Sequence, residues 1–250
     1  MSFFSLLALA LAPGTAIGIY IYLKDKHERE PLGLLLISFF YGALSTIVTL
    51  VITFSVTFLV ESKDVEVQAD FINQFVEALF KVALIEEFSK FIFVRFILFY
   101  NRNFNEPFDG IVYAVMVSMG FATLENILYV FQAESGLITG ILRMFTAVPA
   151  HATFGVLMGY FLGKAKFSQH NSLFFTLVAL IAATVFHGSY DYFLFVGKVN
   201  GAWAGIWIGA LISLITAFFL SRAAIRLHQQ SSPFIERAQE KDPSDLTPNA

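Results

Sequence analysis

Apolar runs of about twenty residues or more recur along the chain, and a run of that length is what an α-helix needs to cross the hydrocarbon core of a membrane. The runs lie at about 3–23, 32–60, 79–100, 108–132, 138–163, 173–196 and 201–222. This pattern predicts an all-α fold, a polytopic transmembrane helical bundle of about seven spans. The second run is longer than one crossing requires, so we expect it to tilt, kink or break.

Two segments do not fit a membrane crossing. Within residues 61–78 and just beyond, Asn73, Glu77 and Lys81 recur every four positions, which predicts an amphipathic helix on the outer surface leading into the third span. Residues 224–250 are rich in Gln, Ser, Pro and charge, and predict a disordered, solvated tail. We therefore expect one transmembrane domain at 1–223. No sequence repeat relates its two halves, which argues against a transporter built from inverted repeats.

The composition agrees with a protein dissolved in lipid. Hydrophobic residues make up 57% of the chain and charged residues 14%, and the mean hydropathy is +0.69. A soluble domain of this length needs more polar surface. The net charge of −3 gives no sign of a nucleic-acid partner, and we expect none. Cysteine is absent, which excludes thiol nucleophiles, disulfides and Cys-ligated metals.

Basic residues in the loops predict the orientation, because Lys and Arg favour the cytoplasmic side. The first run has no basic residue before it, so we expect an uncleaved first span. Ten cations fall on one side and two on the other, which places the N-terminus outside and the C-terminus in the cytoplasm. The ten are Lys24, Lys26, Arg29, Arg102, Lys164, Lys166, Arg222, Arg226, Arg237 and Lys241, and the two are Lys63 and Lys198.

Glycines spaced by four predict close packing of helices in lipid, where apolar burial gives no drive for association. The stripes are Gly155, Gly159 and Gly163 on the fifth span and Gly201, Gly205 and Gly209 on the seventh.

Ionisable residues occur within four consecutive spans, where each is costly to bury. They are Glu86, Glu87 and Lys90 on the third span, Glu125 on the fourth, His151 on the fifth, and His187 and Asp191 on the sixth. At ~1.5 Å per residue, all but Lys90 lie within about 10 Å of the midplane, mostly toward its outer side. Lipid cannot solvate them, so we expect them to face one another around a polar cavity. Pro149 should loosen the helix just before His151.

Each of these residues also has a purely structural explanation. Glu86 or Glu87 could form a neutralised pair with Lys90, a lone His is often a satisfied core residue, and Glu125 could bond a neighbouring helix. Asp191 could merely fix the tautomer of His187. It is improbable that four helices would each bury ionisable residues at the same depth for unrelated structural reasons. This coincidence favours a shared site. By contrast, we expect solvated side chains at His27, His170 and His228, and a snorkelling one at Arg143.

The chemistry that fits these residues is hydrolysis. A glutamate near a cation stays ionised and can take a proton from water, while a second carboxylate or an imidazole polarises the carbonyl or protonates the leaving amine. Alternatively, a Zn²⁺ ion would activate the water. Its candidate ligands are His151, His187, Glu125 and Asp191. The His-Glu-x-x-His signature is absent, and spacing leaves both mechanisms open. A proton-coupled transporter and an inactive membrane scaffold are the alternative functions.

The ordered motifs resemble a known family. Glu86-Glu87-x-x-Lys90, Phe121-x-x-x-Glu125, the isolated His151 and His187-x-x-x-Asp191 resemble the PrsW family of intramembrane proteases over roughly residues 80–195. That family is similar in motif order to the CAAX prenyl protease (Abi) superfamily. CAAX proteases typically have an Arg after the paired Glu and a His in the second motif. Lys90 and Glu125 stand at those places here, which favours the PrsW branch.

The resemblance implies a peptidase of the bacterial inner membrane. Its substrate would be a membrane-anchored regulatory protein, such as an anti-sigma factor, cut on the outer side. PrsW proteins are usually labelled metalloproteases, whereas CAAX relatives are often described as glutamate proteases, so Zn²⁺ is a candidate cofactor beside a metal-free mechanism. We expect Glu86 to be the principal base, with Glu87 and Lys90 orienting it. The residues expected to complete the site are Glu125, His151, His187 and Asp191.

Overall fold

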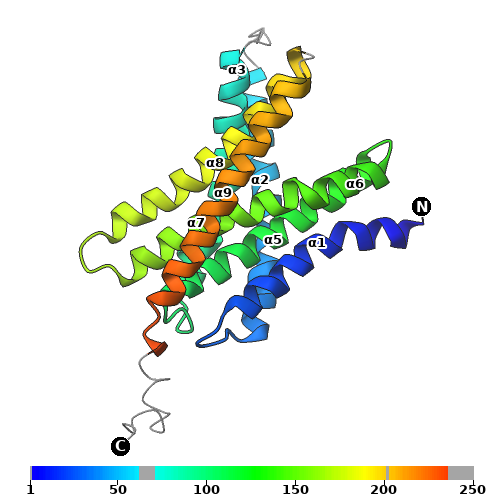
Figure 1. Cartoon of the computed structure of the whole chain (residues 1–250). Coiled ribbons are helices and arrows are strands. Elements are labelled where there is room, and N and C mark those ends of the chain that lie inside the picture. Colours follow the sequence, from blue (N-terminus) through cyan, green and yellow to red (C-terminus); the bar gives the residue numbers. More distant parts are fainter. Residues whose placement is uncertain (1, 62–70, 201–202, 236–250) are drawn as a thin grey trace, which may run out of the picture.

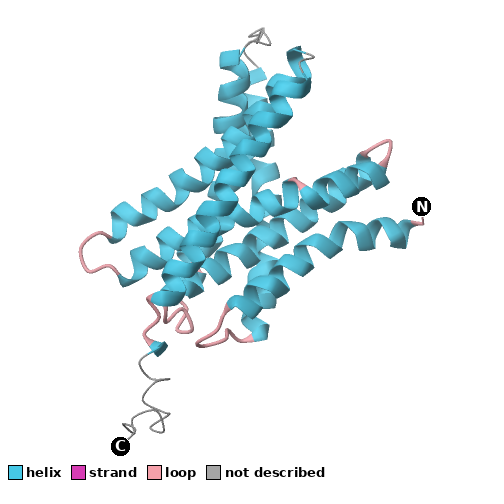
Figure 2. Ribbon diagram, in the orientation of Figure 1, coloured by secondary structure: helices cyan, strands magenta, loops and turns pink. Residues whose placement is uncertain are grey.

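The computed structural model describes residues 2–61, 71–200 and 203–235, and the secondary structure in these ranges is helical (Figures 1 and 2). This confirms the predicted all-α bundle. In chain order the elements are α1 (Phe3–Lys24), α2 (Leu32–Glu61), α3 (Phe71–Val76), the π-helix η1 (Glu77–Ala83), α4 (Leu84–Phe96), the 3₁₀-helix η2 (Leu98–Tyr100), α5 (Pro107–Gln132), α6 (Gly136–Phe145), α7 (Ala147–Phe167), α8 (Ser172–Asn200) and α9 (Trp203–Gln230).

Six of the predicted spans are helical segments long and apolar enough to cross a membrane. They are Phe3–Lys24, Leu32–Leu59, Pro107–Gln132, Gly136–Phe167, Ser172–Val196 and Ile208–Gln230. The predicted span at 79–100 corresponds to α3, η1 and α4, which follow one another without a break from residue 71 to residue 96. This run is less apolar because it carries the acidic and basic residues of the site.

The surface helix expected within 61–78 begins at Phe71 and continues directly into η1, while residues 62–70 lie outside the described ranges. Lys81 pairs with Glu77 at 2.7 Å, so the four-residue spacing does place two of the polar side chains on one face. A π-turn adds a residue to a helical turn and often occurs near functional sites. Here η1 ends three residues before Glu86, and it therefore sets which way the paired glutamates face.

The second and fifth predicted spans differ in regularity. The second is a single helix, α2, with no break along Leu32–Glu61. The fifth is divided into α6 and α7 at Thr146, whose φ of −123° and ψ of −80° are not helical. Because Pro149 lacks an N–H group and its ring crowds the preceding turn, it favours a break of this kind. The loosening expected ahead of His151 is thus confirmed.

Helix α5 is the centre of the bundle, and its residues from Phe108 to Thr123 are all buried. Glycines let its neighbours approach its backbone. A Cβ atom on Gly42 of α2 would clash with the Val117 carbonyl of α5, and one on Gly159 of α7 would clash with the Gly110 carbonyl. The stripe predicted on the fifth span is therefore a packing surface against α5.

The C-terminal helix is longer than predicted. The seventh span was expected to end at 222 and the tail to begin at 224, but α9 continues to Gln230. His228, expected to be solvated, is buried, and its ring stacks on Tyr160 with centroids 4.4 Å apart. The expectation was wrong because Gly163 has no side chain and leaves room for the imidazole. His27 and His170 are exposed, as expected. Residues 236–250 of the tail, and Gly201, are outside the part of the chain described here.

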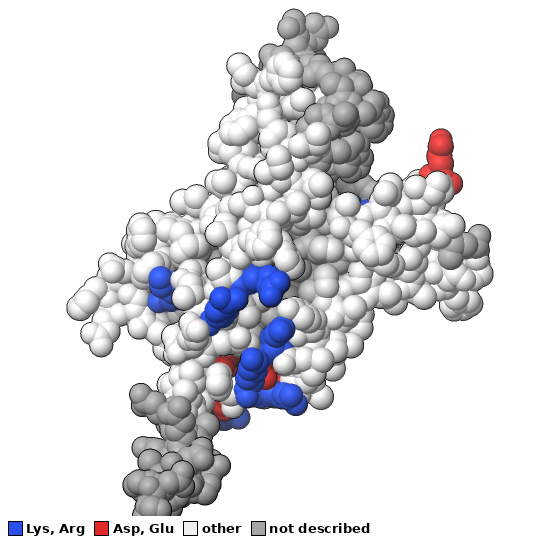
Figure 3. Space-filling view, viewed as in Figure 1, with Lys and Arg blue, Asp and Glu red and all other residues white. Residues whose placement is uncertain are grey.

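Orientation can be tested with single cysteines, because the chain contains none of its own. Helix α1 begins and helix α9 ends at opposite ends of the bundle (Figure 1), and Lys and Arg gather on the part near the end of α9 (Figure 3). We expect Glu134→Cys, in the exposed α5–α6 connection, to react with a membrane-impermeant maleimide on intact cells. Asn171→Cys, between α7 and α8, should react only after permeabilisation. The reverse pattern would invert the predicted topology.

The packing role of the glycine stripe gives a second prediction. Gly159→Ala should destabilise the protein by about 1–3 kcal/mol, because the added methyl group overpacks the contact with α5. Gly33→Ala, in the first turn of α2, is the matched control, since an added Cβ there meets no atom within 4 Å. The measurement is the thermal unfolding midpoint of each purified variant in detergent. Equal midpoints for the two variants would contradict this account.

Candidate active site

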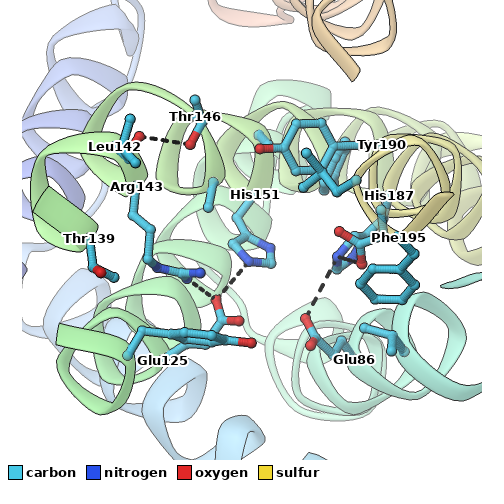
Figure 4. A pocket seen from close by; sticks show the side chains of 17 residues that line it. Glu86, Glu125, Thr139, Leu142, Arg143, Thr146, His151, His187, Tyr190 and Phe195 are labelled. Carbon is cyan, nitrogen blue, oxygen red and sulfur yellow. Dashed lines mark hydrogen bonds and ion pairs between the residues drawn. The ribbon is translucent and has the colours of Figure 1, made fainter. Parts of the chain in front are cut away.

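A cavity of about 500 Å³ lies inside the bundle, between the η1–α4 run and helices α5 to α8. Five of the predicted site residues line it, and Figure 4 shows the side chains of the four that it labels, Glu86, Glu125, His151 and His187, directed toward one another. The five are Glu86, Glu125, His151, His187 and Asp191. The other two, Glu87 and Lys90, are 0% exposed and contact the lining residues from behind. The expectation that these side chains face one another around a cavity is met.

Lys90 connects two of the helices. Its Nζ lies 2.7 Å from Glu87 Oε1 and 3.1 Å from Nδ1 of His151, and Nε2 of His151 lies 3.0 Å from Glu125 Oε2. An ammonium group can only donate, so Nδ1 of His151 accepts and the ring proton sits on Nε2, which donates to Glu125. Lys90 also lies 4.0 Å from the centre of the Phe121 ring. The contacts thereby fix both the tautomer and the direction of the His151 ring.

His187 is surrounded by carboxylates. Its Nδ1 lies 2.9 Å from Glu87 Oε1, and its Nε2 lies 3.2 Å from Asp191 Oδ2 and 3.8 Å from Glu86 Oε2. The four-residue spacing of His187 and Asp191 does bring them into contact. A neutral imidazole donates through one nitrogen only, so a second proton or a metal ion is needed where the other nitrogen faces a carboxylate.

Local packing holds the His187 ring in place. Phe154 of α7 stacks on it, with centroids 4.9 Å apart and planes at 16°. The next residue, Gly188, lies against Leu79 and Ala83 of η1, and a Cβ atom there would be within 3.4 Å of both. A small residue at 188 therefore lets α8 approach η1 closely enough for His187 to reach the paired glutamates.

Arg143 belongs to the site, contrary to the expectation that it would snorkel outward. Its Nη2 lies 2.6 Å from Glu125 Oε2, and its Nε donates to Asn126 Oδ1 at 3.0 Å. Asn126 in turn donates to the Ala10 carbonyl of α1 at 3.1 Å. Arg143 lines the cavity from α6, and the backbone leaves helical geometry three residues later, at Thr146. The signal for this role was present in the sequence, since an Arg inside an apolar run is as costly to bury as a Glu.

One group of residues in the described structure is arranged to hold a metal ion. Glu86, His151 and His187 each offer a ligand atom, and these atoms lie within 4.8 Å of one another. The two histidines belong to the set predicted from sequence. The sequence predicted Glu125 and Asp191 as the carboxylate ligands, whereas the carboxylate of this group is Glu86. Glu125 is already paired with Arg143 and His151.

A second cluster of buried carboxyl groups lies near the other end of α5. Asp25, Glu30, Glu106 and Asp109 are each at most 5% exposed, and the Tyr113 hydroxyl donates to Glu30. Burial raises the pKa of Asp25 to about 7 and also raises the pKa values of Glu30 and Glu106. The cluster ties the α1–α2 connection to the start of α5. Sequence reasoning missed it because Asp25, Glu30 and Glu106 lie in the connections between predicted spans, where an acidic residue is ordinary.

The fold and the cavity define a multi-pass membrane protein with an embedded ionisable site, and comparison with known proteins names its family. The profile described as PrsW family intramembrane metalloprotease matches residues 30–221. The chain therefore belongs to the PrsW family, and it is a multi-pass membrane peptidase. The resemblance found in the motifs is confirmed.

Several relatives are similar over most of their length. Protease PrsW of Geobacillus kaustophilus is 37% identical over 208 residues, which cover 83% of this chain and 88% of that protein. Protease PrsW of Bacillus subtilis is 36% identical over 194 residues, covering 76% and 83% respectively. Protease PrsW of Clostridioides difficile is 28% identical over 242 residues, covering 94% and 97%. No solved structure matches the chain.

The contact between His187 and Asp191 predicts that the two act as a unit. His187→Ala and Asp191→Ala should each reduce cleavage by 100-fold or more, on the order of losses at other catalytic groups. The double variant should be little worse than His187→Ala, because residues that act as a unit lose nearly all of their effect when either one is removed. Cleavage of a membrane-anchored test substrate is measured at matched protein levels. Fully multiplicative losses would show that the residues work separately.

Proposed function

We propose that the cavity is the peptidase active site and that it hydrolyses a peptide bond in a membrane-anchored regulatory protein resembling an anti-sigma factor. The observation that carries this proposal is the convergence of Glu86, Glu125, His151, His187 and Asp191, from four different helical segments, on one cavity inside the bundle. Membership of a peptidase family supports hydrolysis rather than transport. It equally favours an enzyme over an inactive scaffold.

The proposed site includes a divalent metal ion such as Zn²⁺, held by Glu86, His151 and His187. Charge supports this assignment. Four carboxylates face two fixed cations, Lys90 and Arg143, so the cluster with neutral histidines is two positive charges short. Buried charge must be compensated, and a divalent ion does so at once. In addition, Glu86 Oε2 is buried without a hydrogen-bond partner.

The hydrogen bonding of His187 also suits a metal site. Ligating imidazoles usually donate their other N–H group to a carboxylate or carbonyl. Nδ1 of His187 already faces Glu87, which leaves Nε2 directed toward Asp191 and Glu86. For His151 to bind the ion through Nε2, its ring proton would move to Nδ1, and Lys90, which can only donate, would keep Glu87 as its partner. Arg143 would keep Glu125 ionised. When bound, the ion would polarise the scissile carbonyl and lower the pKa of water.

The remaining residues then have distinct roles. Asp191 faces the cavity with no Lys or Arg partner among the described residues, so its carboxylate is the group best placed to take a proton from water. Glu87 orients His187, and Lys90 holds Glu87 in place. Asp191 can then pass the proton taken from water to the leaving amine, while Glu125 stays ionised beside Arg143. Glu86 was expected to be the base, and its place between the histidines favours a ligand role.

Replacing Glu86 tests the site. Glu86→Gln should reduce cleavage of a single-span anti-sigma-factor-like substrate by 100-fold or more, and the purified protein should lose its bound metal. Glu77→Gln is the matched control, because it removes a carboxylate that pairs with Lys81 outside the cavity. Metal content by mass spectrometry is measured alongside cleavage. Lost activity with retained metal would restore Glu86 as the base, and full activity would place the reaction elsewhere.

A further inference from the structure

A second large cavity, of about 650 Å³, opens between α1, α7 and α9, away from the ionisable site. Its lining is apolar over most of its length, with side chains such as Ile17, Val156, Leu214 and Phe218. From Leu214 to Ile225 the groove follows α9 for about 16 Å. The hydrocarbon core of a bilayer is ~30 Å thick, so the groove spans about one leaflet. Its dimensions suit a single acyl chain.

Positive charge stands at one end of this groove. Arg222 lines it, as does Tyr20, and Lys24 lies one turn further along α1 with its Nζ 5.2 Å from the Tyr20 ring centre. Neither cation forms an ion pair with a carboxylate of the described residues. Figure 3 shows Lys and Arg side chains gathered on this part of the surface. The basic loops predict that this end lies at the cytoplasmic face.

We propose that the groove binds an anionic phospholipid of the cytoplasmic leaflet. Its acyl chain would lie between α1, α7 and α9, and its phosphate would contact Arg222 and Lys24. Basic pockets between transmembrane helices on the cytoplasmic side bind anionic headgroups in this way. The unpaired cations explain why the occupant is anionic, and the leaflet-long apolar wall explains why it is a lipid.

The same helix forms a wall of both cavities. Pro149, Ala152 and Thr153 of α7 line the groove, whereas His151 lines the ionisable cavity. Ser221 of α9 donates to the Thr153 carbonyl at 3.3 Å, which holds α9 against α7 at this level. A bound acyl chain therefore supports α7 where His151 is positioned. The lipid is expected to raise peptidase activity, and this consequence rests on the proposed function, whereas binding itself does not.

Binding is tested on the purified full-length protein in detergent. Palmitoyl-oleoyl phosphatidylglycerol and the matching phosphatidylcholine are added in equal amounts, and retained lipid is measured by native mass spectrometry. Each cation should contribute about a 5-fold preference for the anionic headgroup. The double variant Arg222→Gln, Lys24→Gln should lose this preference. The double variant Arg102→Gln, Lys164→Gln, which removes two exposed cations on the α4–α5 connection and on α7 that do not line the groove, should keep it.

The acyl-chain contact is tested separately. Ala152→Leu places a larger side chain in the groove and should reduce retention of both lipids at least 5-fold while the cations remain. Equal retention of the two lipids by the wild type, or unchanged preference in the Arg222→Gln, Lys24→Gln variant, would overturn the proposal. Cleavage is measured on the same samples. Selective binding with no change in activity would leave the site intact and remove only its coupling to His151.

Discussion

The arrangement of the site depends on the two contacts of the Lys90 ammonium group, one with Glu87 and one with His151. This group is completely buried, and it joins Glu87 of its own helix to His151 of α7. Removing one partner of a buried ion pair typically costs 3–5 kcal/mol, because the other charge is left uncompensated. Glu87 then bonds His187, so one cation determines the position of both imidazoles. The paired glutamates are for this reason not equivalent, with Glu87 internal and Glu86 facing the cavity.

This contact requires helices that approach one another closely. In lipid, helices associate through small residues and polar contacts, because burying apolar surface does not favour helix association there. Gly159 brings α7 against α5, and Gly188 brings α8 against η1. His187 adjoins Gly188 on α8, and His151 lies about two turns before Gly159 on α7. The contacts that the helices make at these glycines therefore set the distances between the side chains on opposite walls of the cavity.

The sequence alone predicted much of this architecture. Six spans follow from apolar length, and the gathering of seven ionisable residues in one cluster follows from the cost of burying charge in lipid. Local deviations in the backbone could not be predicted in the same way. The π-turn at η1 has no residue signature of its own, although it decides how Glu86 and Glu87 face. The burial of His228 depends on the absence of a side chain at Gly163 of another helix, which no local pattern encodes.

Arg143 shows how a single side chain affects the electrostatics of the site. The backbone leaves helical geometry at Thr146, three residues further along the chain, and the Arg143 guanidinium reaches Glu125. Without that cation, the four carboxylates would face Lys90 alone, and the cluster would be three positive charges short rather than two. A deficit of two is what a single divalent ion can balance, so the proposed metal site depends on the charge of Arg143.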